Sequence, residues 1–459
     1  MNKRTLLRSM GFFAFFIALT YSFLTNGFGV APWNEWAVWE QGSDMMVLKR
    51  IEMDIINRDV SVLGLAAYEG DELSVLERLQ PSNISNLAYT APTEFIPYES
   101  EIGGQAHFLS FVWRDLGCSS ISCLRAVNST LMAATTLVLF LGFIRMGAVG
   151  LGVAWLISQF ASPWITFGAR NLFWSPWVYF LPAIAAIGLV LAKSRRSRLI
   201  AILAVFSAFA FKYVMTGYHE ISAFIMLAAA MPVVHLLFAP NSSRNEIIRQ
   251  LKNSVMVLIA GVVSFVIVLA FHAQLLTGNV ISGVNQIWVN AVLRRSYGDV
   301  LSADTTLTNP SPQNPVGVLW RYMWSNWWTD LLGFGINRDG NILSWSLGSA
   351  SFMFLTVVCV GVVLIRYSRK DKSWIRDSLL LIIGFSIPAF WLMGAKNYAA
   401  AHPHILFFPW YWFYIPVLLY VTVSFIKDFG SLILAWLGIS NKDESIPLTG
   451  KSGDQIAES

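Results

Sequence analysis

The chain contains little charge and few cysteines for its length. Charged residues make up 13% of its 459 positions, and there are three cysteines, whereas hydrophobic residues make up 55%. An ordinary soluble domain has about 25% charged residues. This shortage of charge excludes an ordinary soluble protein and indicates a polytopic membrane protein.

Several motifs are also missing. The sequence contains no internal repeat and no matched pair of interrupted apolar segments, which argues against a secondary transporter. Its apolar runs contain almost no ionisable residues, which argues against a transport path through the membrane. No histidines have the spacing of an HExxH helix. No cofactor is therefore predicted with certainty, and a divalent metal ion remains an open alternative.

Apolar runs long enough to cross about 30 Å of hydrocarbon recur along the whole sequence. They predict an all-α polytopic membrane protein with about ten transmembrane helices. The expected spans are residues 6–24, 126–145, 147–164, 172–192, 198–214, 217–238, 254–276, 347–366, 378–395 and 407–426.

Basic residues cluster in short segments between these runs, at 1–8, 193–198, 244–252 and 366–376. Such clusters resist translocation, so both termini are predicted to be cytoplasmic and the long loops periplasmic or extracellular. The net charge of +5 then reflects topology, and no nucleic-acid partner is expected. The first apolar run lacks a convincing small-residue cleavage site, which favours a retained anchor.

Two external loops are much longer than the other connections. We expect a single integral membrane domain over 1–426, with external loops at 25–124 and 277–346, an interfacial helix at 427–440 and a disordered cytoplasmic tail at 441–459. Within the loops, helical spacing of apolar residues predicts amphipathic helices at 35–56, 286–295 and 319–332. Cys118 and Cys123 can pair in the first loop if its compartment is oxidising.

Acidic side chains in the first loop are candidate catalytic groups. Glu35 lies between tryptophans about ten residues after the first apolar run, where an apolar wall would raise its proton affinity and suit it to act as a general base. Glu99 and Glu101 precede Gly103 and Gly104, which allow a ligand to approach the backbone closely. The alternatives are a first-turn acid interacting with a helix dipole for Glu35, and solvated loop acids for Glu99 and Glu101.

Positive charges are scarce on the predicted external side. Arg170 with its neighbour Asn171, Lys212 and Lys396 all lie at external helix ends, where a cation near hydrocarbon costs about 2 to 3 kcal/mol unless it is partnered. A phosphate or pyrophosphate would be such a partner, which makes these residues candidate substrate-binding groups. Snorkelling to lipid headgroups or pairing with nearby acids is the alternative.

Histidines form a further external set. His219 with Glu220, and His402 with His404, could bind substrate hydroxyls, shuttle protons or ligate a metal ion. Interfacial hydrogen bonding is the alternative for each histidine. The many tryptophans mostly fit the aromatic belt of a membrane protein rather than sugar-stacking platforms.

The layout of one helix, a large acidic external loop, further helices and a second long external loop resembles the C-type (GT-C) glycosyltransferase superfamily. There an acidic pair follows the first helix and supplies the catalytic carboxylate, and here Asn34 and Glu35 occupy that place. The segments YESEIGGQ, ARNLFWSPWVYFLP, KYVMTGYHEIS and AHPHILFFPWYW are similar to stretches in bacterial members associated with surface polysaccharide.

This resemblance implies transfer of a sugar from a polyprenyl-phosphate donor to a hydroxyl of a glycan, lipid or protein acceptor. The reaction would take place on the external face of a bacterial inner membrane. A carboxylate would deprotonate the acceptor, and Arg170, Lys212 or Lys396 would stabilise the departing phosphate.

Two other classes of protein remain open. An O-antigen polymerase or ligase also acts on polyprenyl-linked glycans, although its large loop usually comes late in the chain. A non-catalytic carrier-lipid-binding protein or flippase is the other alternative, and the shortage of ionisable residues in the helix cores counts against it.

Overall fold

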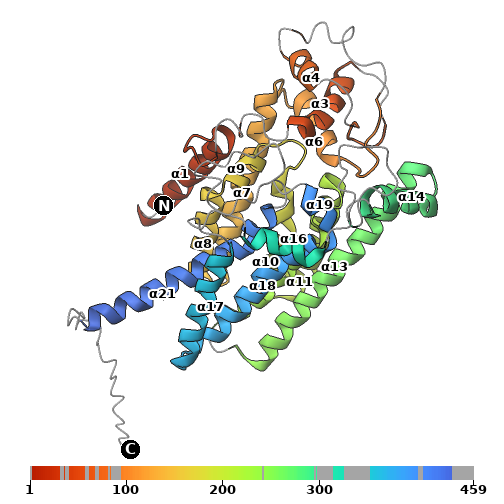
Figure 1. Ribbon diagram of the computed structural model, residues 1–459. Coiled ribbons are helices and arrows are strands. Elements are labelled where there is room, and N and C mark those ends of the chain that lie inside the picture. The colour runs from red at the N-terminus through yellow and green to blue at the C-terminus, as the bar shows by residue number, and fades with distance from the viewer. Residues whose placement is uncertain are drawn as a thin grey trace, which may run out of the picture.

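The computed structural model describes residues 3–31, 36, 41–56, 61–67, 72–80, 83, 95–239, 242–293, 296, 314–324, 352–401 and 407–436. Within these ranges the chain is all-helical (Figure 1). The extended segments that the structure describes form one isolated bridge, between Ala66 and Pro97. The predicted all-α class is therefore confirmed for the described chain.

Six of the described helices are long and apolar enough to cross a membrane. They are α7 (Ile121–Arg145), α11 (Arg195–Thr216), α12 (Ile221–Phe238), α13 (Arg244–Thr277), α18 (Ser373–Gly394) and a segment from Trp410 to Phe429 that joins the π-helical turn η6 (Trp410–Tyr414) to α21 (Ile415–Trp436). These helices support the prediction of an integral membrane protein.

Other predicted spans correspond to shorter apolar helices. These are the apolar part of α1 (Lys3–Thr25), α8 (Val149–Ala161), η2 (Pro176–Phe180) with α10 (Leu181–Leu191), and α17 (Phe352–Ser368). The expected span at 147–164 is interrupted in the structure. Ser162 accepts a hydrogen bond from the backbone N–H of Ile165, and Pro163 starts the separate helix α9 (Pro163–Ala169). Serine at an N-cap followed by proline at the first helical position is a typical helix start.

Serine caps also start three of the long helices at their N-termini. Ser120 caps α7, Ser243 caps α13, and Ser194 and Ser197 form a reciprocal capping box at the start of α11. Each serine satisfies backbone N–H groups that the helix itself leaves unbonded. The polar sequences before the apolar runs therefore define where these helices begin.

The first long loop forms a helical cap at one end of the bundle (Figure 1). It contains α3 (Gln41–Ile55), α4 (Glu72–Arg78) and α6 (Gly104–Asp115). Arg78 pairs with the buried Glu52 at 2.5 Å, which joins α4 to α3. Ser110 on α6 donates to Asp54 on α3 at 2.6 Å. The cap is thus a folded unit, and α3 covers most of the range 35–56 in which a helix was expected.

The described part of the second long loop also contains helices. Gly278, in a left-handed conformation, is the C-cap of α13. Asn279 caps α14 (Val280–Ile287), which continues into the π-helical turn η3 (Trp288–Leu293). A Cβ at Gly283 would lie 2.2 Å from the carbonyl oxygen of Ala273, so α14 packs closely against the end of α13. The helix α16 (Pro315–Trp324) overlaps the one expected at 319–332.

The last third of the chain contains the short helix α19 (Lys396–Ala401) and the long helix α21. The helix α19 follows α18 directly, and Tyr322 of α16 donates to the carbonyl of Ala399 at 2.8 Å. α21 continues without a break across the boundary expected at 426/427. The tail predicted at 441–459 lies outside the described residues.

Candidate functional site

Glu101 lies at the junction between the cap and the membrane helices. It lies two residues before Gly103, which has a φ of 76° and is the N-cap of α6. A Cβ at Gly103 would lie 2.7 Å from the backbone nitrogen of Leu65, and one at Gly104 would lie 2.8 Å from the carbonyl of Val214. The two glycines therefore allow close backbone packing between the cap and α11, rather than the ligand approach expected from the sequence.

A tight turn at residues 217–220 joins α11 to α12. Gly217 has φ 60° and ψ −144°, and Glu220 has a left-handed φ of 52°. A Cβ at Gly217 would lie 2.6 Å from Cγ of Glu101. The turn thus presents its backbone to the Glu101 side chain, and only glycine has room there.

Glu101 and His219 form a buried pair at this turn. Oε1 of Glu101 lies 2.5 Å from Nε2 of His219, and the residues are 0% and 3% exposed. An ionised carboxylate can only accept a hydrogen bond, so the geometry assigns the Nε2 proton to His219 and leaves Nδ1 as the basic nitrogen. A carboxylate that orients an imidazole in this way is a common general-base arrangement.

Lys212 holds the same turn in place from within the bundle. Its Nζ donates to the carbonyls of Gly217 at 3.0 Å and His219 at 2.7 Å, and the residue is fully buried. The ammonium group also lies 4.3 Å from the ring centroid of Phe224 and 4.5 Å from that of Tyr179. These contacts compensate a buried cation and make Lys212 a positioning group for His219.

Aromatic rings surround His219. The ring centroids of Trp174, Tyr398 and Phe173 lie 4.8, 6.0 and 6.1 Å from that of His219. Gln105 on α6 donates to the carbonyl of Phe173 at 3.2 Å. The surroundings of the imidazole therefore combine a carboxylate on one nitrogen with largely apolar rings around the rest.

Glu220, the next residue in the turn, is also buried, at 2% exposure. It lines a cavity of about 10 Å³ together with Trp174, Tyr179 and Trp412, among others. A cavity of this size has room for about one water molecule. Trp174, which also contacts His219, and Tyr179, which also contacts Lys212, line this cavity, so Glu220 lies beside the buried pair.

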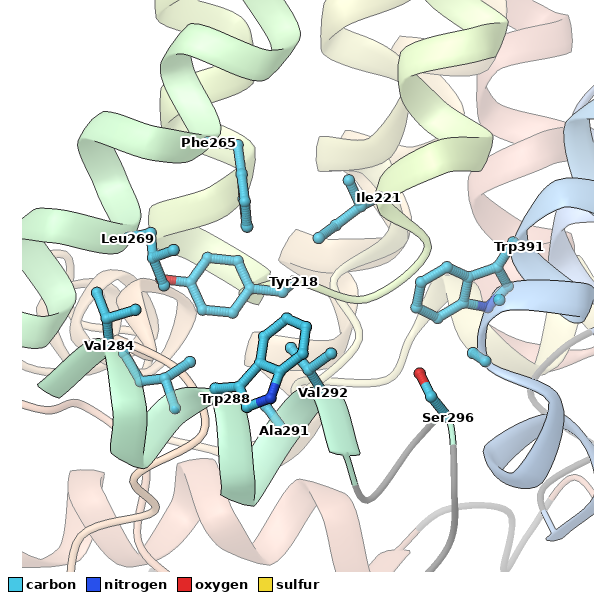
Figure 2. A pocket seen from close by; sticks show the side chains of 13 residues that line it. Tyr218, Ile221, Phe265, Leu269, Val284, Trp288, Ala291, Val292, Ser296 and Trp391 are labelled. Atoms are coloured by element: carbon cyan, nitrogen blue, oxygen red, sulfur yellow. The ribbon is translucent and has the colours of Figure 1, made fainter. Parts of the chain in front are cut away.

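A larger apolar cavity of about 230 Å³ adjoins the turn, with Tyr218 among its lining residues. Figure 2 shows Tyr218, Trp288 and Trp391 around this space, with Ile221 and Phe265 on the walls from α12 and α13. The hydroxyl of Tyr218 lies 3.1 Å from Nδ1 of the buried His272. Because Tyr218 immediately precedes His219, the cavity and the Glu101–His219 pair share one turn of the chain.

Lys396 follows two residues that line this cavity and precedes a residue that contacts His219. Gly394 and Ala395 line the apolar cavity, and Tyr398, two residues after Lys396, contacts the His219 ring. Lys396 is half-buried. Of the predicted external cations, it is the one that the sequence brings next to both the cavity wall and the buried pair.

Arg170 contacts Trp36 of the first loop. It donates a hydrogen bond to the carbonyl of Trp36, and its guanidinium carbon lies 3.5 Å from the Trp36 ring centroid. Burial and repulsion from Arg125 lower the pKa of Arg170 to about 10, although Asp44 partly opposes this. Asp44 pairs with Arg125 at 2.9 Å and accepts from the N–H of Leu172 at 2.7 Å. Burial raises the pKa of Asp44 despite these contacts.

The other predicted residues occupy structural positions. Asn171 accepts from the N–H of Trp174 at 2.8 Å, and its carbonyl accepts from Asn128 at 2.7 Å. Glu99 points towards the second loop, where Gln286 donates to it at 2.6 Å. The structure therefore separates Glu99 from Glu101, although they are two residues apart in the sequence.

Three predicted site residues lie outside the described residues, namely Glu35, His402 and His404. In the parts of the chain that the structure describes, no group of three or more His, Cys, Asp or Glu side chains is arranged to hold a metal ion. Cys118 and Cys123 form the disulfide that the sequence allowed, with Cα atoms 5.6 Å apart.

Sequence reasoning missed the contacts of Asp44 and Arg125 and the pairing of Tyr218 with His272. Arg125 could have been found, because it is a cation at the predicted external end of a helix, like Arg170. Asp44 was one acid among several in the first loop, and nothing in its spacing indicates a partner 81 positions away.

A comparison of the chain with protein-family models, curated proteins and solved structures finds no significant match.

Proposed function

We propose that the protein is a membrane glycosyltransferase that transfers a sugar from a polyprenyl-phosphate donor to a hydroxyl acceptor on the external face of the membrane. The observation that carries this proposal is the buried Glu101–His219 pair, which shares the 217–220 turn with an apolar cavity between membrane helices. A base beside an apolar space suits a substrate with a polar reacting group and a long hydrocarbon tail.

In this reaction the acceptor hydroxyl gives its proton to Nδ1 of His219 and forms a bond to the anomeric carbon of the donor sugar. The bond from that carbon to the phosphate oxygen breaks, and the polyprenyl phosphate leaves with the electron pair. Glu101 stabilises the imidazolium that forms. His219 is therefore the proposed base, with Glu101 as its partner, instead of one of the carboxylates that the sequence suggested.

The apolar cavity is the proposed site for the first part of the polyprenyl chain. Its walls combine aromatic and aliphatic side chains, including Trp288, Trp391 and Leu269 (Figure 2). Lys396 follows the cavity wall directly and is the proposed partner of the departing phosphate, since a cation there stabilises the charge that develops on it. Arg170 is less suited to that role because Trp36 covers it.

The test is transfer of radiolabelled sugar from a panel of polyprenyl-phosphate donors by the purified protein in nanodiscs. Glu101→Gln and His219→Ala should each lower turnover by about 100-fold or more, as expected for loss of a general base. Asp115→Asn, an exposed acid of the same loop, should leave turnover unchanged. Lys396→Met should lower turnover, whereas donor analogues with a protonated phosphate should still bind to this variant.

Two results would reject this assignment. Normal turnover by both Glu101→Gln and His219→Ala would exclude the pair as the base, and Glu35→Gln and Glu99→Gln would then be the next variants. Donor binding without transfer to any acceptor would favour a polymerase or a non-catalytic carrier-binding protein. Turnover that stops with EDTA and returns with Mg²⁺ or Mn²⁺ would show a metal requirement.

A further inference from the structure

Another cavity, lined mainly by polar residues, lies at the opposite end of α11 from the Glu101–His219 pair. It measures about 190 Å³ and is lined by Leu189, Ala192, Lys193, Ser194, Arg195, Arg198, Arg249 and Asn253. We call it the basic cavity. The 22 residues of α11 span about 33 Å, so the basic cavity is remote from the proposed catalytic turn.

Cations from three segments converge on the basic cavity. Lys193 comes from the connection after α10, Arg195 and Arg198 from the first turn of α11, and Arg249 from the start of α13. The tendency of basic residues to remain on one side of a membrane explains why they are near this face. It does not explain why they surround one cavity that has room for several water molecules.

Few acids compensate these charges. Arg249 pairs with Glu246 at 2.8 Å, and Gln250 also donates to that carboxylate. Arg198 donates to the neutral side chain of Asn253 at 2.9 Å. Within the described chain, Lys193 and Arg195 form no ion pair. The cavity therefore keeps a net positive charge that an anion would neutralise.

The start of α11 adds a helix dipole to this charge. The capping box of Ser194 and Ser197 fixes the first turn and already binds the N–H groups of both serines. The dipole of the helix favours an anion at this end. A phosphate has several acceptor oxygens, so it can accept from more than one of the arginine forks that line the cavity.

We propose that the basic cavity binds a phosphate group, supplied either by an anionic lipid headgroup or by a soluble phosphate. The apolar wall from Leu189 and Ala192 makes a lipid headgroup the expected source, because the acyl chains would continue over the helix surface. This inference concerns another end of the molecule and does not depend on the proposed glycosyl transfer.

The test compares two double variants with the same loss of charge, each removing one lysine and one arginine. Lys193→Gln with Arg195→Gln alters the basic cavity, whereas Arg196→Gln with Lys252→Gln removes exposed charges that do not line it. Binding of dioleoylphosphatidylglycerol to the purified full chain is measured by native mass spectrometry and by the rise in melting temperature. Dioleoylphosphatidylcholine and inorganic phosphate are the other two ligands.

We expect phosphatidylglycerol to bind the cavity variant about 25-fold more weakly than the wild type, which is about fivefold for each charge removed. The control variant should bind like the wild type. Stabilisation by inorganic phosphate alone, lost in the cavity variant, would assign the site to a soluble phosphate. Equal weakening in both variants, or in neither, would overturn the proposal. Equal melting temperatures without ligand show that both variants fold.

Discussion

The carboxylate of Glu101 lies directly over Gly217, so that a Cβ at position 217 would be 2.7 Å from its Cδ and 2.8 Å from its Oε2. The shape of the turn and the position of the acid therefore depend on each other. The loop of the cap and the connection between α11 and α12 fit together only because residue 217 has no side chain.

Gly217→Ala should abolish transfer. The new methyl group would displace Glu101, and the backbone φ of 60° is unfavourable for alanine. We expect turnover to fall by about 100-fold or more, as for loss of the base itself, together with a lower melting temperature. Gly188→Ala is the matched control, because nothing lies within 4 Å of its Cβ position in α10. Full activity of Gly217→Ala would show that Glu101 does not need its observed position.

Lys212→Met should destabilise the protein by about 2 to 4 kcal/mol. The variant would leave the carbonyls of Gly217 and His219 without the charged donor that now binds them. The measurement is the free energy of unfolding in detergent, with the exposed Lys372→Met as the control. If Lys212 instead bound donor phosphate, as the sequence suggested, the variant would lose donor affinity and keep its stability.

Arg170→Lys should destabilise the protein at pH 7, and the difference from wild type should shrink as the pH rises towards 9. Burial lowers the pKa of Arg170 only to about 10, so the folded protein keeps most of this arginine charged up to about pH 9. Lysine has an unperturbed pKa of about 10.4, and the same burial would depress its folded-state pKa further below that value. A base with a depressed folded pKa binds fewer protons when folded, so its stability rises with pH in that window.

Melting temperatures of wild type and Arg170→Lys, recorded at several pH values from 7 to 9, check this expectation. Their difference isolates residue 170, because the other titrating groups are common to both proteins. A difference that does not change with pH would mean that the side chain at position 170 is well solvated.

Reduction of the Cys118–Cys123 disulfide should cost about 2 kcal/mol of stability, because the bond closes a loop of only a few residues. The same bond tests the predicted topology. Disulfides persist in oxidising compartments, so these cysteines should resist alkylation in intact cells until a reductant is added. A membrane-impermeant reagent should then label them. Labelling without reduction would place this segment on the reducing side.

Hydropathy alone predicted the helical class and the longest helices. Apolar runs predicted α7, α12, α13 and α18 with their approximate ends. In hydrocarbon the backbone N–H and C=O groups of a long apolar run can be hydrogen-bonded within the run only if it forms a helix. The same measure merged α8 with α9, since it does not register that Ser162 and Pro163 end one helix and begin another.

The candidate site was predicted as separate residues and not as an arrangement. The scarcity of external charge identified Glu101, His219, Lys212 and Lys396. Their geometry was not predictable, because Glu101 and His219 are 118 positions apart and meet through the backbone contacts of Gly103, Gly104 and Gly217. Sequence patterns record what one helix or turn prefers, whereas this contact depends on how two distant segments pack.

The separation of Glu101 and His219 also determines when the pair can form during synthesis. Glu101 leaves the ribosome more than a hundred residues before His219, and it has no imidazole partner until α11 has been made and the turn at 217–220 has closed. A chain stopped after α10 would therefore carry the acid without its base. The pair becomes complete only when the membrane insertion of α11 and α12 brings their connection to the side where the cap has folded.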